Sequence, residues 1–169
     1  MDSIKIDSLP YRKNVSCIVF KAKKFLLIQN NDWLKNWWKF PQGGVNKGEP
    51  LEKAAIRELK EELGTDKFSI LGKSKKINQY DWNDKSLELS KYKWRGQIQN
   101  YLIVEFIGEE NEIKIDSKEI RQYKWVTVDD LWPSIDHDDK NFTNYKTTLK
   151  EVFKEFNLAK RGLILTCQY

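Results

Sequence analysis

The sequence predicts an α/β protein with a mixed β-sheet packed between helices. Three observations support this fold class: short β-rich runs lie on both sides of one strong helical segment, a second helical segment closes the chain, and no repeat or linker divides it. A length of 169 residues is sufficient to bury one hydrophobic core. We therefore expect a single domain over residues 1–169.

The composition is typical of a folded cytoplasmic protein. Apolar residues make up 40% of the chain and include seven tryptophans, which excludes extensive disorder although 33% of the residues are charged. The first residues lack the apolar core of a secretory signal, and the longest apolar runs are too short to span a bilayer. Cys17 and Cys167 form no disulfide or ligand pattern, and Cys17 is predicted to be a buried free thiol. We expect no membrane partner, and the net charge of +5 is only weak support for a polyanionic one.

The first quarter of the chain is predicted to form a β-hairpin followed by an aromatic segment. Residues 15–20 and 24–29 are rich in β-branched and apolar residues and are separated by the basic sequence KAKK. Residues 31–44, NDWLKNWWKFPQGG, end in a proline and two glycines, so they are predicted to be a strand that enters a loop. The three tryptophans of this segment are more typical of packing than of a platform for a nucleobase.

The strongest helix prediction covers residues 51–63. This segment has no Gly or Pro, is rich in Ala, Leu, Glu and Lys, and is followed by Gly64, a common residue at helix ends. Three later runs are predicted strands: 69–82, 96–108 and 120–128. Residues 83–95 are predicted to be a polar loop, and the apolar spacing in residues 144–159 indicates a closing helix.

Glutamates gather on one side of the predicted helix 51–63. Glu58, Glu61 and Glu62 stand at positions i, i+3 and i+4 and project from one face, away from the apolar stripe. Like charges this close repel one another, and a divalent cation bound through carboxylate oxygens removes that repulsion. A solvated helix with ordinary ion pairs is the alternative, but the separation of these acids from the lysines and the preceding Gly-Gly loop favour Mg²⁺ or Mn²⁺.

The same glutamates belong to a longer motif. It begins at Gly43, has Glu49 after five intervening residues, and continues after seven more with RELKEELG. Residues 43–65 thus resemble the Nudix box, G-x5-E-x7-R-E-U-x-E-E-x-G-U, where U is a bulky aliphatic residue; Thr65, at a packing position, is the one departure. The resemblance implies a Nudix-type α/β/α sandwich and metal-dependent hydrolysis of a nucleoside diphosphate linked to another group.

The resemblance also implies a role for each residue of the box. The implied metal ligands are Glu58, Glu61, Glu62 and the carbonyl group of Gly43, with Glu62 the most heavily used. Arg57 and Glu49 are expected to brace the loop and orient these ligands. Metal ions would neutralise the phosphate oxygens and lower the pKa of a bound water, which is the chemistry that hydrolysis of a pyrophosphate requires.

Segments outside the box resemble one branch of the family, the RNA 5′-pyrophosphohydrolases, and the dinucleoside polyphosphate hydrolases share the same pattern. The similarity covers roughly residues 9–156 and includes the PQGG turn. It implies that Arg12 contacts substrate phosphates, that Gln97 lies near the substrate and Tyr80 near its base, and that Glu119 ligates the metal or positions water.

Each of these roles competes with a simpler one. Arg12 could be a solvated charge, Tyr80 a packing residue and Glu119 half of a surface ion pair. The intact glutamates of the box favour an enzyme over a Nudix module that only binds nucleotide or RNA. We therefore expect hydrolysis of triphosphorylated or diphosphorylated RNA 5′ ends, with diadenosine tetraphosphate as the alternative substrate.

Overall fold

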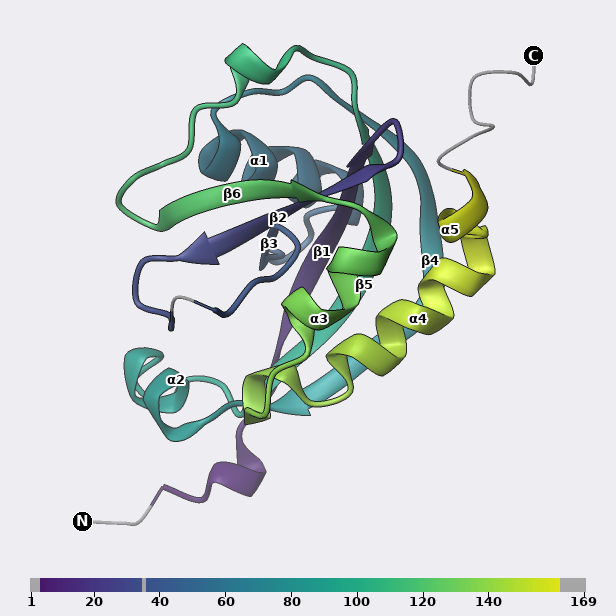
Figure 1. The fold of residues 1–169 in the computed structure, drawn as a ribbon. Coiled ribbons are helices and arrows are strands. Elements are labelled where there is room, and N and C mark those ends of the chain that lie inside the picture. Colours follow the sequence, from purple (N-terminus) through teal and green to yellow (C-terminus); the bar gives the residue numbers. More distant parts are fainter. Residues whose placement is uncertain (1–3, 35, 162–169) are drawn as a thin grey trace.

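A six-stranded mixed sheet forms the centre of the protein in the computed structural model, which describes residues 4–34 and 36–161 (Figure 1). The strands are β1 (Tyr11–Lys21), β2 (Lys24–Asn30), β3 (Gln42–Gly44), β4 (Phe68–Asp81), β5 (Gly96–Phe106) and β6 (Ile120–Val126). Their order is β4-β5-β1-β2-β6, and the short β3 also pairs with β1. β1 runs parallel to β5 and antiparallel to β2 and β3, so the predicted mixed sheet is confirmed.

Helices cover both faces of this sheet. The helices are α1 (Leu51–Leu63), α2 (Asp84–Leu89), α3 (Val128–Ile135), α4 (Tyr145–Phe156) and α5 (Leu158–Arg161). α1 packs on one face, and α3 and α4 pack on the other (Figure 1). The α/β/α arrangement is therefore confirmed, and because one sheet carries both hydrophobic clusters we infer that the chain forms one domain.

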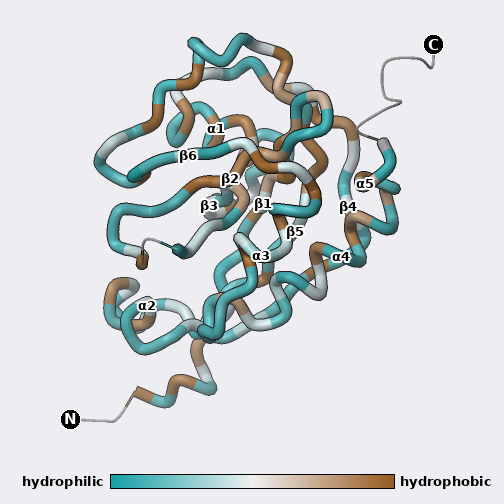
Figure 2. The backbone as a smooth tube through the Cα atoms, viewed as in Figure 1, coloured by the Kyte–Doolittle hydropathy of each residue, from teal (hydrophilic) through white to brown (hydrophobic). Residues whose placement is uncertain are grey.

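The alternation of side chains along the central strands explains the two layers. In β1, Cys17 and Val19 belong to the cluster under α1, whereas Ile18 and Phe20 belong to the cluster under α3 and α4. A strand buried on both faces reads as one continuous apolar run, as β1 does. Figure 2 shows hydrophobic residues concentrated around the central strands, while much of β6 at the sheet edge is hydrophilic. Cys17 is a buried free thiol, as predicted, and Cys167 lies outside the described residues.

Helix α1 follows the sequence prediction residue for residue. It ends at Gly64, which adopts the left-handed conformation with φ = 71° and donates its backbone N–H to the carbonyl of Lys60. Leu59 and Leu63 are fully buried on its inner side. Because that apolar stripe is fixed against the sheet, the glutamate face of α1 has a fixed direction as well.

Three sequence predictions about irregular segments are wrong in detail. The described residues of the segment 31–44 contribute only the short β3 and one isolated bridge, because Trp33 and Trp37 pack against the ring of Phe142. Residues 83–95 contain the helix α2, which begins where the side chain of Asn83 accepts a hydrogen bond from the N–H of Ser86 at 2.9 Å.

The third difference is α3, which the sequence did not reveal. The strand predicted for residues 120–128 ends at Val126, and α3 begins directly after Thr127, whose side chain caps it. Pro133 lies inside this helix and weakens the helical signal in the sequence. Within the described ranges, no helix combines the length and apolar character needed to cross a membrane.

Candidate active site

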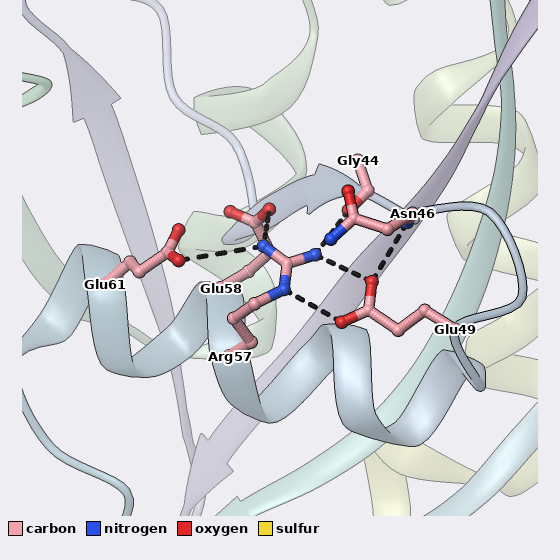
Figure 3. Close-up of polar contacts among 6 residues, drawn as sticks. All are labelled: Gly44, Asn46, Glu49, Arg57, Glu58 and Glu61. Atoms are coloured by element: carbon pink, nitrogen blue, oxygen red, sulfur yellow. Dashed lines mark hydrogen bonds and ion pairs between the residues drawn. The ribbon is translucent and has the colours of Figure 1, made fainter.

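The loop that joins β3 to α1 is tied to the glutamate face of the helix by Arg57 (Figure 3). The guanidinium Nε donates to Glu49 Oε1 at 2.8 Å, and Nη2 donates to Glu49 Oε2 and to the carbonyl of Gly44, both at 2.9 Å. The backbone N–H of Asn46 also donates to Glu49. The hydrogen bonds from Arg57 and Asn46 lower the pKa of Glu49 to about 2, which keeps it ionised. The contribution of Glu49 and Arg57 to catalysis stays a prediction.

Two of the predicted metal ligands lie beside the same guanidinium group. Arg57 Nη1 donates to Glu58 Oε1 at 2.8 Å and lies 3.7 Å from Glu61 Oε1 (Figure 3). The side chain of Glu58 is 16% exposed and that of Glu61 is 60% exposed. Burial raises the pKa of Glu58, and the ion pair with Arg57 opposes that effect.

Gly43 allows the carboxylate of Glu58 to approach the backbone of β3. A Cβ atom at position 43 would lie 1.9 Å from the carboxyl carbon of Glu58, so no side chain fits there without moving that carboxylate. The predicted ligands Gly43 and Glu58 are therefore neighbours in space, although they lie on different elements.

Glu62 is the most buried carboxylate of the box. It is 6% exposed, and its Oε2 atom has no hydrogen-bond partner among the described residues. Burial raises the pKa of Glu62 to about 8. A buried carboxylate oxygen without a partner is costly, so this atom indicates that a ligand is needed.

Lys39, which no sequence motif singled out, is a buried cation whose charge interacts with that of Glu62. It is 7% exposed, and burial lowers its pKa while the charge of Glu62 acts in the opposite direction. Its Nζ atom lies 4.5 Å from the centre of the Trp33 ring. The only sequence signal was a single lysine between aromatic residues just before the PQGG turn.

Glu119 comes from the segment before β6 and reaches the same neighbourhood. Its backbone N–H donates to the carbonyl of Asp116, whose own N–H donates to the carbonyl of Glu62, so this segment lies against the end of α1. The residue is exposed, and its backbone carbonyl accepts a hydrogen bond from the N–H of Asn31 at 2.9 Å. The structure thus places the segment of Glu119 beside α1, and the chemical role of Glu119 stays a prediction.

This donor set fits a divalent cation. Among the described residues, no three acidic, histidine or cysteine side chains are arranged as a metal cage, and Arg57 forms ion pairs with both Glu58 and Glu61. The chemistry nevertheless matches: Glu58, Glu61 and Glu62 of one helix supply hard oxygen donors, and Oε2 of Glu62 has no hydrogen-bond partner among the described residues. Glu58, Glu61 and Glu62 are the residues that would hold the ion.

Arg12 lies between the box and a large cleft. A Cβ atom at Gly44 would lie 2.2 Å from Arg12 Nη2, so the guanidinium group rests against the backbone of β3. Burial raises the pKa of Glu58, and the positive charge of Arg12 opposes that rise. On the other side, Arg12 lines a cleft of about 990 Å³ between the start of β1, residues 44–50 and the segment that contains α2. This position suits a contact with substrate phosphates, which stays a prediction.

Tyr80 and Gln97 are adjacent, but neither is open to solvent. They pair across β4 and β5, and Gln97 Nε2 donates to the hydroxyl group of Tyr80 at 2.5 Å. Tyr80 is 5% exposed and Gln97 is 4% exposed. An exposed stacking face for Tyr80 is therefore absent from the structure, because the strand pairing turns its ring inward. Both residues line a small cavity of about 30 Å³, and their contact with a substrate remains a prediction.

Comparisons with known proteins agree with this arrangement. The NUDIX domain family matches residues 10–148. The chain is 31% identical to the RNA pyrophosphohydrolase of Wolbachia pipientis subsp. Culex pipiens, covering 91% of this chain and 94% of that protein. It is 36% identical to the RNA pyrophosphohydrolase of Campylobacter jejuni, covering 78% of this chain and 86% of that protein.

Solved structures support the fold. The dihydroneopterin triphosphate pyrophosphohydrolase of E. coli has a TM-score of 0.61 at 16% identity, covering 83% of this chain and 99% of that one. An Ap4A hydrolase from C. elegans has a TM-score of 0.59 at 17% identity, covering 85% of this chain and 98% of that one. At identities this low, the similarity supports a shared fold and does not extend to function. Together with the family match, the findings show that the chain belongs to the Nudix family, whose hydrolases act on phosphoanhydride bonds and generally use divalent metals.

Proposed function

We propose that this Nudix hydrolase removes pyrophosphate or phosphate from the 5′ end of triphosphorylated or diphosphorylated RNA, with Mg²⁺ or Mn²⁺ as its metal. One observation carries the proposal: the metal-binding face of α1 and the phosphate-binding candidate Arg12 adjoin, and Arg12 opens directly into a large cleft. The identity of 31–38% to curated RNA pyrophosphohydrolases supports the same substrate. A cytoplasmic location, as the sequence predicts, is part of this proposal.

Each residue of the site has its own role in the proposed hydrolysis. Glu58, Glu61 and Glu62 hold the metal, which when bound neutralises phosphate oxygens and lowers the pKa of water. Arg12 donates to the phosphate chain through charge-assisted hydrogen bonds. Glu119 either adds a metal ligand or orients the attacking water. In the reaction, water adds across a P–O–P bridge: the attacked phosphorus gains the hydroxyl group, and the bridging oxygen leaves with the other fragment, which takes up the proton and is released as phosphate or pyrophosphate.

Arg57 acts on the reaction through other groups. Its hydrogen bonds fix Glu49, the carbonyl of Gly44 and the carboxylate of Glu58 in one network. A rigid network of this kind orients ligands for an ion. Arg57 and Glu49 are positioning residues in this proposal.

Hydrolysis of diadenosine tetraphosphate is the second candidate, because the cleft beside Arg12 is large enough for a second nucleoside. A side-by-side rate comparison separates the two. Initial rates are measured with Mg²⁺ on 5′-triphosphorylated RNA and on diadenosine tetraphosphate, with the same enzyme preparation and with Glu62→Gln as the background control. We expect the RNA to be the faster substrate, with phosphate or pyrophosphate released and a 5′-monophosphorylated RNA remaining.

A clearly higher catalytic efficiency on the dinucleotide would replace the RNA proposal by the second candidate. Specific binding of RNA without turnover in Mg²⁺ or Mn²⁺ would instead indicate a binding module, and it would contradict the enzymatic proposal for both substrates.

A further inference from the structure

We propose that the cleft beside Arg12 binds the single-stranded RNA chain that follows the 5′ nucleotide. The proposal rests on the proposed function and specifies how the substrate continues beyond the reacting phosphates. Six side chains of the cleft carry the argument: Arg12, Lys13, Lys47, Lys93, Trp82 and Trp94. They come from the start of β1, the loop before α1 and the two ends of the segment that contains α2.

The charge of the cleft matches a polyanion. Four of its lining residues are cationic, and among the described residues that line it the acidic one is Glu49. Glu49 is already engaged by two hydrogen bonds from Arg57, which together with the N–H of Asn46 lower its pKa to about 2. Because that negative charge is compensated, the cations Lys13, Lys47 and Lys93 are left to set the potential of the cleft.

The indole rings provide the second component of a single-strand site. Trp82 and Trp94 are both partly exposed along the cleft, and Lys93 Nζ lies 5.2 Å from the centre of the Trp94 ring. A cationic groove with accessible aromatic rings is the arrangement by which proteins hold single strands, since phosphates pair with the cations and bases stack on the rings. Bases inside a duplex are already stacked, so a duplex cannot use these rings.

The segment that contains α2 forms the wall of the cleft with Trp82 and Trp94, and hydrogen bonds fix both of its ends. Arg95 donates to both carboxylate oxygens of Asp81, at 2.9 and 3.0 Å, and the hydroxyl of Tyr11 donates to Asp81 at 2.7 Å. The backbone N–H of Trp82 donates to the carbonyl of Arg95 at 3.0 Å, which joins the two ends of the segment beside Trp94. These bonds preorganise the wall and reduce the entropy lost when RNA binds.

The turn that precedes Lys93 and Trp94 has an unusual backbone conformation. Lys91 and Tyr92 both have positive φ, 53° and 55°, in a region that non-glycine residues seldom occupy. The N–H groups of both are hydrogen-bonded, to the carbonyls of Glu88 and Leu87. Such a conformation persists when the surrounding structure holds it, and it often occurs where side chains must be aimed at a ligand.

The cleft is continuous with the proposed reaction site. Arg12 lines the cleft and lies against Gly44, and the adjacent Gly43 lies against the carboxylate of Glu58, so Arg12 adjoins both the cleft and the glutamate face. A 5′ phosphate chain placed between Arg12 and the glutamates would direct the attached nucleotides into the cleft. A single mononucleotide leaves most of a volume of about 990 Å³ unfilled.

Binding can be tested without hydrolysis. The probe is an eight-nucleotide RNA with a 5′-hydroxyl end, which has no phosphoanhydride bond, measured by tryptophan quenching and anisotropy over a series of KCl concentrations. We expect the affinity to fall with salt by a slope of about 0.7 for each phosphate neutralised. The double variant K47Q/K93Q should lower that slope by about 1.4. Trp94→Ala should weaken binding by about 5- to 150-fold, the effect expected for one lost base stack.

Lys150→Gln is the control for the change at Lys93. Lys150 lies on α4, outside the cleft, with Nζ 5.6 Å from the centre of the Trp132 ring, so the change removes the same charge from a similar lysine–tryptophan pair. We expect its salt slope and affinity to equal those of the unaltered protein. Thermal unfolding of every variant shows whether the fold is retained, and Trp94→Phe, which keeps a ring, should recover part of the binding lost in Trp94→Ala.

The proposal is overturned if the 5′-hydroxyl RNA does not bind, or if K47Q/K93Q and W94A bind it as K150Q does. It is also overturned if these variants raise the KM for diadenosine tetraphosphate while the RNA still fails to bind, because the cleft would then hold the second nucleoside of a dinucleotide. Binding of the oligonucleotide without any hydrolysis of its 5′-triphosphorylated form would contradict the proposed function and leave the cleft as an RNA site.

Discussion

The glutamate face of α1 and the cationic cleft adjoin at Arg12, but Glu58 and Glu62 of the first are largely buried and the lysines of the second are exposed. On the glutamate face, Glu62 is 6% exposed and Glu58 has a 16% exposed side chain, so both carboxyl groups lie in a poorly hydrated environment. In the cleft, the side chains of Lys13, Lys47 and Lys93 are exposed to solvent.

This difference in burial indicates two kinds of binding. A buried carboxylate without a partner interacts strongly at short range, which suits one small ion at a fixed position. Exposed lysines attract at longer range and are screened by salt, which suits a flexible chain that must enter and leave. Changes on the glutamate face should therefore affect the rate and the metal requirement, and changes in the cleft should affect KM and its salt dependence.

Glu62→Gln should produce the largest effect. The change preserves size but removes a charge, so we expect loss of metal binding and at least a ~10²-fold lower rate. Titration calorimetry with Mg²⁺ and Mn²⁺, together with initial rates, measures both. Glu52→Gln, an exposed glutamate in the first turn of the same helix, is the matched control and should leave both unchanged. Near-normal turnover of the Glu62 variant at saturating Mg²⁺ would contradict its assignment as a ligand.

The two adjacent glycines of the turn should separate the two regions. Gly43→Ala would place a methyl group against the carboxylate of Glu58, whereas Gly44→Ala would place one against the guanidinium group of Arg12. We expect the first to raise the metal concentration for half-maximal rate by about 10- to 100-fold. The second should instead raise KM for the phosphorylated substrate.

Each glycine variant is the control for the other, because both alter the same strand. Circular dichroism confirms that the sheet is retained, and rate curves against metal and against substrate give the two constants. Equal changes in both constants for the two variants would show that the glutamate face and the cleft are not separate.

Arg12→Ala should have a smaller effect, directed at the phosphate chain. Loss of a charge-assisted contact should raise KM for substrates with an extended 5′-phosphate chain by about tenfold. If Arg12 acts mainly through solvent-screened electrostatics, the difference from the unaltered enzyme should shrink as KCl is raised. KM is measured at two salt concentrations, with Lys5→Ala, an exposed basic residue, as the control. Unchanged catalytic efficiency on every polyphosphate would return Arg12 to the role of a solvated charge.

Asp81→Asn should have the smallest effect, on stability. Hydrogen bonds from Arg95 hold the pKa of Asp81 below its ordinary value of 3.8. A depressed pKa adds stability that is complete above pH 3.8 and is lost as the pH falls through the lower pKa of the folded state. Asp81 is 39% exposed, so after allowance for solvent screening the contribution is below about 1 kcal/mol.

The expected signature is a lower unfolding temperature for Asp81→Asn at pH 7 and a vanishing difference well below pH 3.8. Thermal melts across this range measure it, and Asp138→Asn, at an exposed aspartate, is the control. A difference that is constant with pH would mean that ionisation of Asp81 does not hold the wall of the cleft.

The sequence predicted an element correctly where the residues of one segment alone determine its structure. Helix α1, its end at Gly64 and the shared face of Glu58, Glu61 and Glu62 follow from helical periodicity and a left-handed glycine. The prediction of the hairpin β1–β2 was also confirmed. Predictions failed at α2 and α3, which are short and depend on caps by Asn83 and Thr127 that a pattern of apolar residues does not reveal.

The features that the sequence did not predict depend on contacts between segments that are distant in the chain. Burial of Tyr80 depends on its pairing with Gln97 across two strands, and the buried position of Lys39 near Glu62 depends on how the aromatic loop packs. The cations and tryptophans of the cleft come from residues 12–13, 47, 82 and 93–94, and these separate segments meet only when the segment that contains α2 packs beside β1. A linear motif fixes directions within one helix because its geometry is local, whereas a cleft requires the long-range pairing of β1, β4 and β5, which no single stretch of residues encodes.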